Sequence, residues 1–123
     1  SDIISLHVPY NASTHYMVGV DELALMKSNA ILINTARGPI VDESALYNAL
    51  AEGIISGAGL DVFEQEPPPE DHALFRLENV ILTAHLAGPT FESFSARVRN
   101  GFDNVQRVAR GENPLWVIPE LSE

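Results

Sequence analysis

The sequence has 123 residues, 46% of them hydrophobic, with 17 acidic and 7 basic side chains and no cysteine. This length and composition predict one folded domain and exclude a disordered chain, disulfides and thiolate metal ligands, and no metal site is predicted. The net charge of −10 repels phosphates and anionic lipids, so we expect neither a nucleic acid nor a membrane as a partner. Without a signal peptide or a membrane-length apolar run, the sequence indicates a cytoplasmic protein.

The first third of the chain predicts two buried strands separated by helical segments. Ile3–Val8 is an apolar run that stops at Pro9, which cannot donate to a strand ladder. A short helical turn is expected over Thr14–Val18. Asp21–Lys27 has acidic residues in its first turn and a lysine at its end, an arrangement that favours a short helix. Ala30–Asn34 is the second predicted strand.

The rest of the chain continues the alternation of strands and helices. Asp42 is a suitable N-cap for a helix over Glu43–Glu52, with Gly53 as the residue that ends it. The later predicted elements are a strand over Ser56–Val62, an irregular proline-rich loop over Phe63–His72, a helical turn over Leu74–Leu77, a strand over Val80–Thr83 and a long helix from Thr90 to about Arg110. This order predicts a parallel sheet with helices on its faces. The apolar tail after Pro114 is expected to dock on another surface.

Three polar side chains, those of Arg37, Glu66 and His85, follow three of the predicted strands. The carboxyl ends of parallel strands lie at one edge of a sheet, where open α/β sheets bind their ligands. Each residue also has a simpler interpretation. Arg37, which sits in an apolar context where a cation costs free energy, can pair with a surface carboxylate. Glu66 can be one more solvated acid, and His85 can be a capping or core histidine.

Considered together, the three side chains form a coherent set for acid–base chemistry. A guanidinium holds a carboxylate through two parallel hydrogen bonds, and a histidine exchanges protons near neutral pH. A carboxylate beside the histidine raises its pKa by favouring the charged form, and it fixes which nitrogen faces the substrate. An arginine anchor with an acid–base histidine suits a 2-keto or 2-hydroxy acid.

Four segments, in order, are similar to the second half of the NAD-binding domain of the D-isomer-specific 2-hydroxyacid dehydrogenases. They are S-L-H-V-P (Ser5–Pro9) with Thr14, I-N-T-A-R-G-P-I-V-D (Ile33–Asp42), G-A-G-L-D-V-F-E-Q-E-P (Gly57–Pro67), and N-V-I-L-T-A-H-L-A-G (Asn79–Gly88) with Thr90 and Glu92. The resemblance implies the second half of a Rossmann-like α/β fold, a partial NAD(P)-binding domain over residues 1–113 followed by a tail over 114–123.

The same resemblance implies a role for each matching residue. Arg37 corresponds to the arginine that binds the substrate carboxylate and carbonyl, His85 to the acid–base histidine, and Glu66 to the partner that raises its pKa. Asp61 matches an aspartate near the nicotinamide carboxamide. The implied cofactor-binding residues are His7, Val8, Pro9, Thr14, Thr35, Ala36, Arg37, Asp61, His85, Ala87 and Gly88. The cofactor implied is NAD, with NADP as the alternative.

The sequence also departs from the family pattern. Ala84 stands where many members have proline, and there is no G-x-G-x-x-G turn for the pyrophosphate and no separate substrate domain. We therefore expect a fragment of a dehydrogenase for a hydroxypyruvate, glyoxylate or phosphoglycerate-type acid, inactive in isolation and dimeric in the whole protein. Two alternatives remain. One is a non-catalytic dinucleotide-sensing or oligomerisation module related to the C-terminal-binding-protein corepressors. The other is a structural fragment that self-associates through an open, apolar edge strand.

Overall fold

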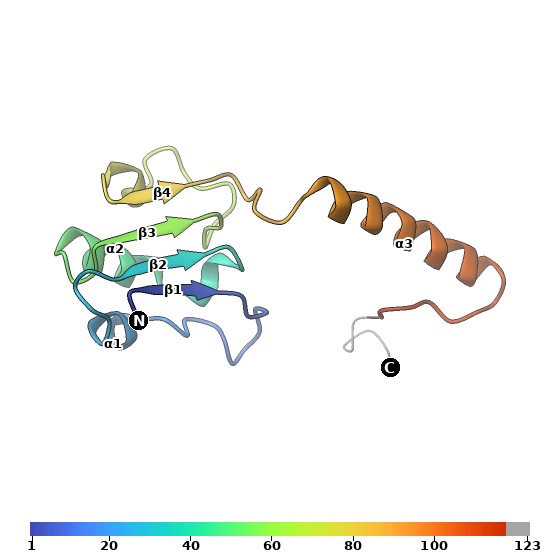
Figure 1. Ribbon diagram of the computed structural model, residues 1–123, viewed down its shortest axis with the longest axis horizontal. Coiled ribbons are helices and arrows are strands. Elements are labelled where there is room, and N and C mark those ends of the chain that lie inside the picture. Colours follow the sequence, from blue (N-terminus) through green and yellow to red (C-terminus); the bar gives the residue numbers. More distant parts are fainter. Residues whose placement is uncertain (118–123) are drawn as a thin grey trace. The chain divides into compact units, whose positions relative to one another are not determined.

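The structure is a computed structural model that describes residues 1–117. The chain forms two compact units, Ser1–Ala87 and Gly88–Glu123 (Figure 1). The first unit holds the sheet and the predicted polar residues from Arg37 to His85. The second holds the long C-terminal helix. In the described part of the chain, no helix is both long and apolar enough to span a bilayer.

The sheet of the first unit has four parallel strands in the order β1–β2–β3–β4, which lie side by side in Figure 1. The strands are β1 (Ile3–Leu6), β2 (Ile31–Asn34), β3 (Gly57–Leu60) and β4 (Val80–Leu82). Asn34 lies opposite Leu6 on one side and opposite Leu60 on the other. The carboxyl ends of β1, β2 and β3 are therefore level with one another, which confirms the predicted parallel sheet and brings the residues that follow these strands to one edge.

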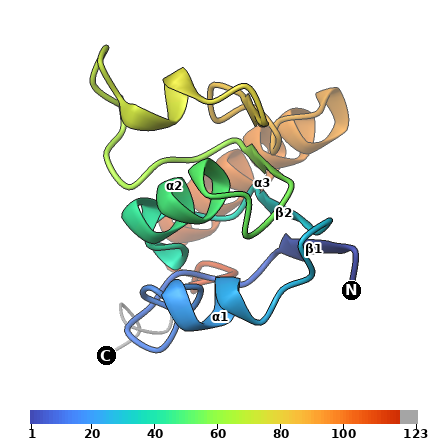
Figure 2. The ribbon, with the colours of Figure 1, turned by 90° about the vertical axis from the view of Figure 1, so that its left-hand side faces the viewer.

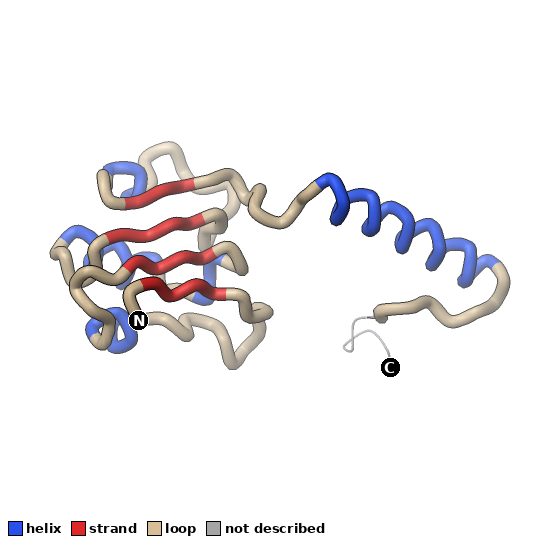
Figure 3. Tube along the Cα trace, viewed as in Figure 1, coloured by secondary structure: helices blue, strands red, loops and turns tan. Residues whose placement is uncertain are grey.

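Helices α1 (Val20–Ala24) and α2 (Glu43–Ala51) cover one face of this sheet (Figure 2). Two short 3-10 helices, η1 (Gly38–Ile40) and η2 (Ala73–Arg76), complete the helical segments of the unit, which Figure 3 distinguishes from its strands and loops. Leu23 of α1 and Leu46 of α2 are buried in one cluster with Leu32 and Leu60 of the strands. Removing this apolar surface from water is the main force that holds the helices on the sheet.

Within the first unit, the side chains on the opposite face of the sheet are largely exposed. Ile3, Ile31 and Ile81 point to that face, because side chains alternate along a strand, and all three are exposed. The prediction that the strands of Ile3 and Ile31 are buried is therefore wrong for one of their two faces. Apolar runs of this kind are typical of parallel strands that have both faces covered.

Several predicted boundaries are also too wide. β1 ends at Leu6 rather than Val8, and α1 ends at Ala24, so Lys27 lies outside the helix. The Nζ atom of Lys27 instead contacts Oδ1 of Asp2 at 2.9 Å. The segment 14–18 contains hydrogen-bonded turns rather than a helical turn. One bond lies within it, from Met17 N–H to the carbonyl of Thr14, and the others run to Asn11 and to the segment 39–42.

The predicted caps of α2 are confirmed. Oδ1 of Asp42 accepts the backbone N–H groups of Ser44 and Ala45, both at 3.0 Å, which satisfies two donors that a helix start leaves free. Gly53 follows the helix with φ +70°, a left-handed conformation in which glycine has no steric penalty. Asp42 therefore fixes the start of α2 only five residues after Arg37.

The second unit contains α3 (Phe91–Ala109), which begins after the N-cap Thr90 and is followed by Gly111 at φ +76°. None of the 19 residues of α3, all of them described, is buried. The backbone N–H of Leu115 donates to Asn104 on α3 at 2.7 Å, but the apolar side chains of Leu115, Trp116 and Val117 are exposed. The predicted docking of the apolar tail therefore stays a prediction. Residues 118–123 of the predicted tail 114–123 lie outside the described residues.

Candidate active site at the edge of the sheet

Arg37 is placed by a tight turn after β2. Asn34, the last residue of the strand, is buried, and its Nδ2 donates to the carbonyl of Arg37 at 2.9 Å while its Oδ1 accepts the N–H of Ala36 at 3.1 Å. These bonds curl Thr35–Arg37 over the strand end. Arg37 itself is exposed, and its Nη1 donates to the carbonyl of Ala36 at 2.6 Å. The prediction that Arg37 is a cation in an apolar context, at a cost in free energy, is therefore wrong, because solvent reaches the guanidinium.

A hollow of about 630 Å³ lies beside Arg37 at the carboxyl ends of β1 and β2. Six predicted cofactor-binding residues line it together with Tyr10: His7, Val8, Pro9, Thr35, Ala36 and Arg37. Its position follows the rule that open α/β sheets bind ligands beyond their carboxyl strand ends. Its size is within the range of sites for small organic ligands, about 300–1,000 Å³.

His85 and Glu66 form a pair in the segments that follow β4 and β3. Nδ1 of His85 lies 2.7 Å from Oε2 of Glu66, and the two side chains are 46% and 38% exposed. An ionised carboxylate only accepts hydrogen bonds, so Nδ1 of His85 carries a proton toward Glu66. Nε2 of the ring has no hydrogen-bond partner within residues 1–117, so it is the nitrogen that can give or accept a proton. A mostly apolar hollow of about 440 Å³, lined in part by Phe63, Pro67 and Phe75, borders the pair.

The carboxylate of Glu66 is held in its charged form. The hydrogen bond from His85 is the largest cause that lowers the pKa of Glu66, and the bond from the backbone N–H of Phe63 to Oε1, at 3.0 Å, is the next. The positive charge of Arg37 lowers this pKa further. Arg37 therefore acts on Glu66 electrostatically. No hydrogen bond joins Arg37 to Glu66 or His85 within residues 1–117.

Asp61, at the end of β3, shapes the turn on which His85 sits. It is buried, and it accepts hydrogen bonds from the Thr83 hydroxyl and from the backbone N–H groups of Leu86 (2.9 Å) and Ala87 (2.8 Å). Burial raises the pKa of Asp61, but these hydrogen bonds together outweigh it, so the pKa lies below its usual value. The bonds also support His85 at φ +54°, which is uncommon for a residue with a side chain.

The remaining predicted cofactor residues have local partners. The Thr14 hydroxyl donates to the carbonyl of Pro9 at 2.8 Å and so closes the loop after β1. Ala87 is bonded to Asp61 through its N–H, and Gly88 begins the second unit, where its carbonyl accepts the Ser93 hydroxyl at 3.3 Å. The contacts of Thr14, Asp61, Ala87 and Gly88 with a dinucleotide stay predictions.

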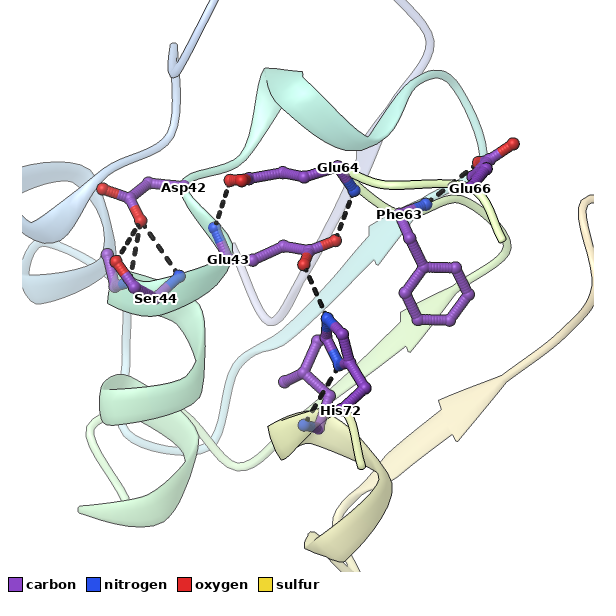
Figure 4. Close-up of polar contacts among 9 residues, drawn as sticks. Asp42, Glu43, Ser44, Phe63, Glu64, Glu66 and His72 are labelled. Atoms are coloured by element: carbon purple, nitrogen blue, oxygen red, sulfur yellow. Dashed lines mark hydrogen bonds and ion pairs between the residues drawn. The ribbon is translucent and has the colours of Figure 1, made fainter. Parts of the chain in front are cut away.

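Some residues that position Arg37, Glu66 and His85 were not predicted from the sequence. Asn34 and Thr83 orient the two turns, and the signal for Asn34 was a polar residue that ends the apolar run I-L-I-N. A second group, Glu43, Glu64 and His72, joins α2 to the loop that carries Glu66 (Figure 4). No sequence signal identified this group, because Glu43 lies 21 residues before Glu64 and 29 residues before His72.

Comparison with known proteins identifies the family. The profile described as "D-isomer specific 2-hydroxyacid dehydrogenase, NAD binding domain" matches residues 1–87. A glyoxylate reductase of Korarchaeum cryptofilum is 51% identical over 114 residues, which cover 93% of this chain and 34% of the relative. The chain therefore spans about a third of the length of this relative.

Solved structures of the family have the same fold. The D-lactate dehydrogenase of Lactobacillus jensenii with NAD⁺ has a TM-score of 0.85 and 38% sequence identity to this chain. The match covers 96% of this chain and 39% of the Lactobacillus jensenii chain. A D-isomer specific 2-hydroxyacid dehydrogenase of Xanthobacter autotrophicus Py2, in complex with NADPH and MES, has a TM-score of 0.82 and 38% identity, over 98% of this chain and 49% of its own. The predicted Rossmann-like fold and family resemblance are thereby confirmed.

Proposed function

We propose, because this chain belongs to the D-isomer specific 2-hydroxyacid dehydrogenase family, that its site reduces 2-keto acids reversibly to D-2-hydroxy acids within a longer protein. The observation that carries the proposal is the 2.7 Å contact between Nδ1 of His85 and Oε2 of Glu66. It leaves Nε2 of His85 as the atom that donates a proton to the carbonyl oxygen in reduction and accepts one from the hydroxyl in oxidation. Glu66 fixes the orientation of the ring.

Arg37 is the proposed anchor for the substrate carboxylate. Its guanidinium is exposed at the end of β2, and its one described side-chain hydrogen bond, to the carbonyl of Ala36, uses Nη1 only. The remaining donors can form the paired hydrogen bonds that a carboxylate accepts from an arginine. Anchoring the carboxylate orients the adjacent carbonyl, and orientation of this kind is a large part of enzymatic rate enhancement.

The family implies a nicotinamide dinucleotide, and the residues at the sheet edge fit one. The hollow beside Arg37 lies where α/β sheets bind such ligands, and its lining includes the apolar residues Val8 and Pro9 and the polar residue Thr35. A bound NADH or NADPH would supply the hydride that reduces the carbonyl carbon. One of the solved relatives above is complexed with NAD⁺ and the other with NADPH, so NAD is the proposed cofactor and NADP the alternative.

The proposal is tested on the full-length protein with glyoxylate and hydroxypyruvate as substrates and with NADH and NADPH as reductants. We expect turnover with at least one pair. In Arg37→Gln, kcat/KM should fall about 100-fold for glyoxylate, and far less for a neutral 2-keto ester, because the ester has no carboxylate to bind. Binding of NADH without turnover of any 2-keto acid would refute the enzymatic proposal and favour a dinucleotide-sensing module.

Three further expectations belong to the same proposal. The isolated chain should be inactive, since it spans about a third of its relative's length. The whole protein should be a dimer in the cytoplasm, with a 2-keto or 2-hydroxy acid as its small-molecule partner. The inactivity of the 123-residue chain is tested by an NADH-oxidation assay. The dimeric state of the whole protein is tested by light scattering. Turnover by the chain alone, or a whole protein that is monomeric, would contradict them.

A further inference from the structure

The peptide between Phe63 and Glu64 lies where the segment that carries Arg37 meets the loop that carries Glu66. Gly38, the residue after Arg37, packs directly against this peptide. A Cβ atom on Gly38 would stand 2.0 Å from both the carbonyl carbon and oxygen of Phe63 and 2.4 Å from the nitrogen of Glu64. Real contacts of this kind are never so short, so the close approach requires glycine. One side of the peptide is thus fixed by the turn that follows Arg37.

Glu43, the first residue of α2, holds the same peptide through hydrogen bonds. Its Oε1 accepts the backbone N–H of Glu64 at 2.6 Å, and the carboxylate of Glu64 accepts the backbone N–H of Glu43 at 3.0 Å (Figure 4). Each glutamate therefore binds the backbone of the other. Hydrogen bonds to ionised carboxylates are stronger than those between neutral groups, so the reciprocal pair ties the loop firmly to the start of α2.

His72 orients the carboxylate of Glu43. Nε2 of His72 lies 2.9 Å from Oε2 of Glu43, and the side chains are only 15% and 14% exposed. The backbone N–H of Leu74 points at Nδ1 at 3.4 Å, so Nδ1 is the acceptor and Nε2 carries the proton that is donated to Glu43. The rings of Phe63 and Phe75 pack on His72 with centroids 5.6 and 5.4 Å away. The second oxygen of Glu43 is therefore aimed at Glu64.

The clamped peptide adjoins the group that holds the proposed proton-exchanging pair, because the N–H of Phe63 belongs to the preceding peptide, one Cα atom away. The backbone N–H of Phe63 donates to Oε1 of Glu66 at 3.0 Å, and Oε2 of Glu66 contacts Nδ1 of His85 at 2.7 Å. A shift of the peptide would therefore move the donor that orients Glu66. It would also change the position of Glu66 relative to the turn of Arg37, because Gly38 packs on the same atoms.

We propose that Glu43 is a positioning residue for the site: by fixing the Phe63–Glu64 peptide against Gly38, it sets the orientation of Glu66 toward His85. The proposal rests on the proposed function for its effect on turnover, but not for its effect on the geometry of Glu66. Glu43 touches neither the proposed substrate site nor His85, so it acts through the loop alone. His72 supports it by fixing the carboxylate of Glu43.

The test compares Glu43→Ala with Glu43→Gln, which keeps one acceptor oxygen, and with a matched control. Glu22 also accepts a backbone N–H through its carboxylate, from Gly19 at 2.9 Å, but at the start of α1. Glu22→Ala therefore removes the same kind of bond elsewhere in the first unit. The first readout is the pKa of Glu66, measured by carboxyl NMR on the 123-residue chain. The second readout is kcat and KM for glyoxylate, each determined separately in the full-length protein.

In Glu43→Ala we expect the pKa of Glu66 to rise toward its ordinary value and kcat to fall about tenfold with KM within about twofold, since misplacement of a catalytic group mainly lowers kcat. Glu43→Gln should lie between Glu43→Ala and the wild type. Glu22→Ala should leave the pKa of Glu66 and kcat unchanged.

An unchanged pKa of Glu66 in Glu43→Ala, or an equal loss in Glu22→Ala, would overturn the proposal. If Glu43→Ala does not fold, Glu43→Gln and His72→Asn decide it by the same criteria. Absence of turnover in the wild type would refute the proposed function, while the NMR measurement would still decide the role of Glu43.

Discussion

The first unit contains two glutamate–histidine pairs with the same chemistry in different surroundings. Glu66 and His85 are 2.7 Å apart with side chains 38% and 46% exposed, whereas Glu43 and His72 are 2.9 Å apart and 14% and 15% exposed. In the exposed pair, Nε2 of His85 has no partner among the residues that the structure describes. In the covered pair, Nε2 of His72 is bonded to Glu43 and Nδ1 accepts from Leu74. The comparison teaches that a short Glu–His contact alone does not identify acid–base chemistry, because a nitrogen must also remain free for the substrate.

The largest expected difference in stability is between the variants His72→Ala and His85→Ala. Replacing His72 with Ala leaves one oxygen of the largely buried Glu43 without its partner, so the free energy of unfolding should fall by about 1–3 kcal/mol. His85→Ala should change it by less than about 0.5 kcal/mol, because the pair it breaks is half-exposed. Urea unfolding of the two variants measures both values. Equal losses in stability would remove the distinction between the pairs.

A smaller effect is expected from the pH dependence of stability. Because hydrogen bonds from His85 and from Phe63 N–H lower the pKa of Glu66 in the folded chain, the folded state binds its proton less readily than the unfolded state does. The stability that Glu66 contributes is therefore present above the ordinary glutamate pKa of about 4.3 and is lost as the pH falls through the lower folded value. Unfolding measured at a series of acidic pH values should give a weaker pH dependence in Glu66→Gln than in the wild type. An identical dependence would indicate that Glu66 is not bonded as described.

The sequence predicted the elements of the first unit well because their signals are local. The strands, the helices, the Asp42 cap and Gly53 are each signalled by residues within one turn or strand. The alternation of strands and helices then predicts the parallel arrangement of β1, β2 and β3. Element ends were less predictable, since Lys27 bonds Asp2 rather than closing α1, a contact between residues 25 positions apart. The burial of Ile3 and Ile31 was overestimated, because apolar composition does not tell which face of a strand a neighbour covers.

The site was predictable only where strand ends bring residues together. Strand-end reasoning placed Glu66 and His85 at one edge of the sheet, and their 2.7 Å contact agrees with it. It did not find that Asp61 holds the turn of His85, that Asn34 shapes the turn of Arg37, or that Glu43 binds the Phe63–Glu64 peptide. These contacts depend on the exact path of loops, and loop paths are not encoded in a periodic pattern.

The most direct test of the account is the kcat of His85→Ala relative to that of His72→Ala in the full-length protein, with glyoxylate and its preferred reductant. The two variants remove the same side chain from the two pairs, so each is the control for the other. Loss of a general acid–base residue lowers kcat by about 100- to 10,000-fold, and we expect this for His85→Ala, while His72→Ala retains at least about a tenth of the wild-type kcat. A His85→Ala variant that is as active as His72→Ala would contradict the assignment of proton exchange to His85.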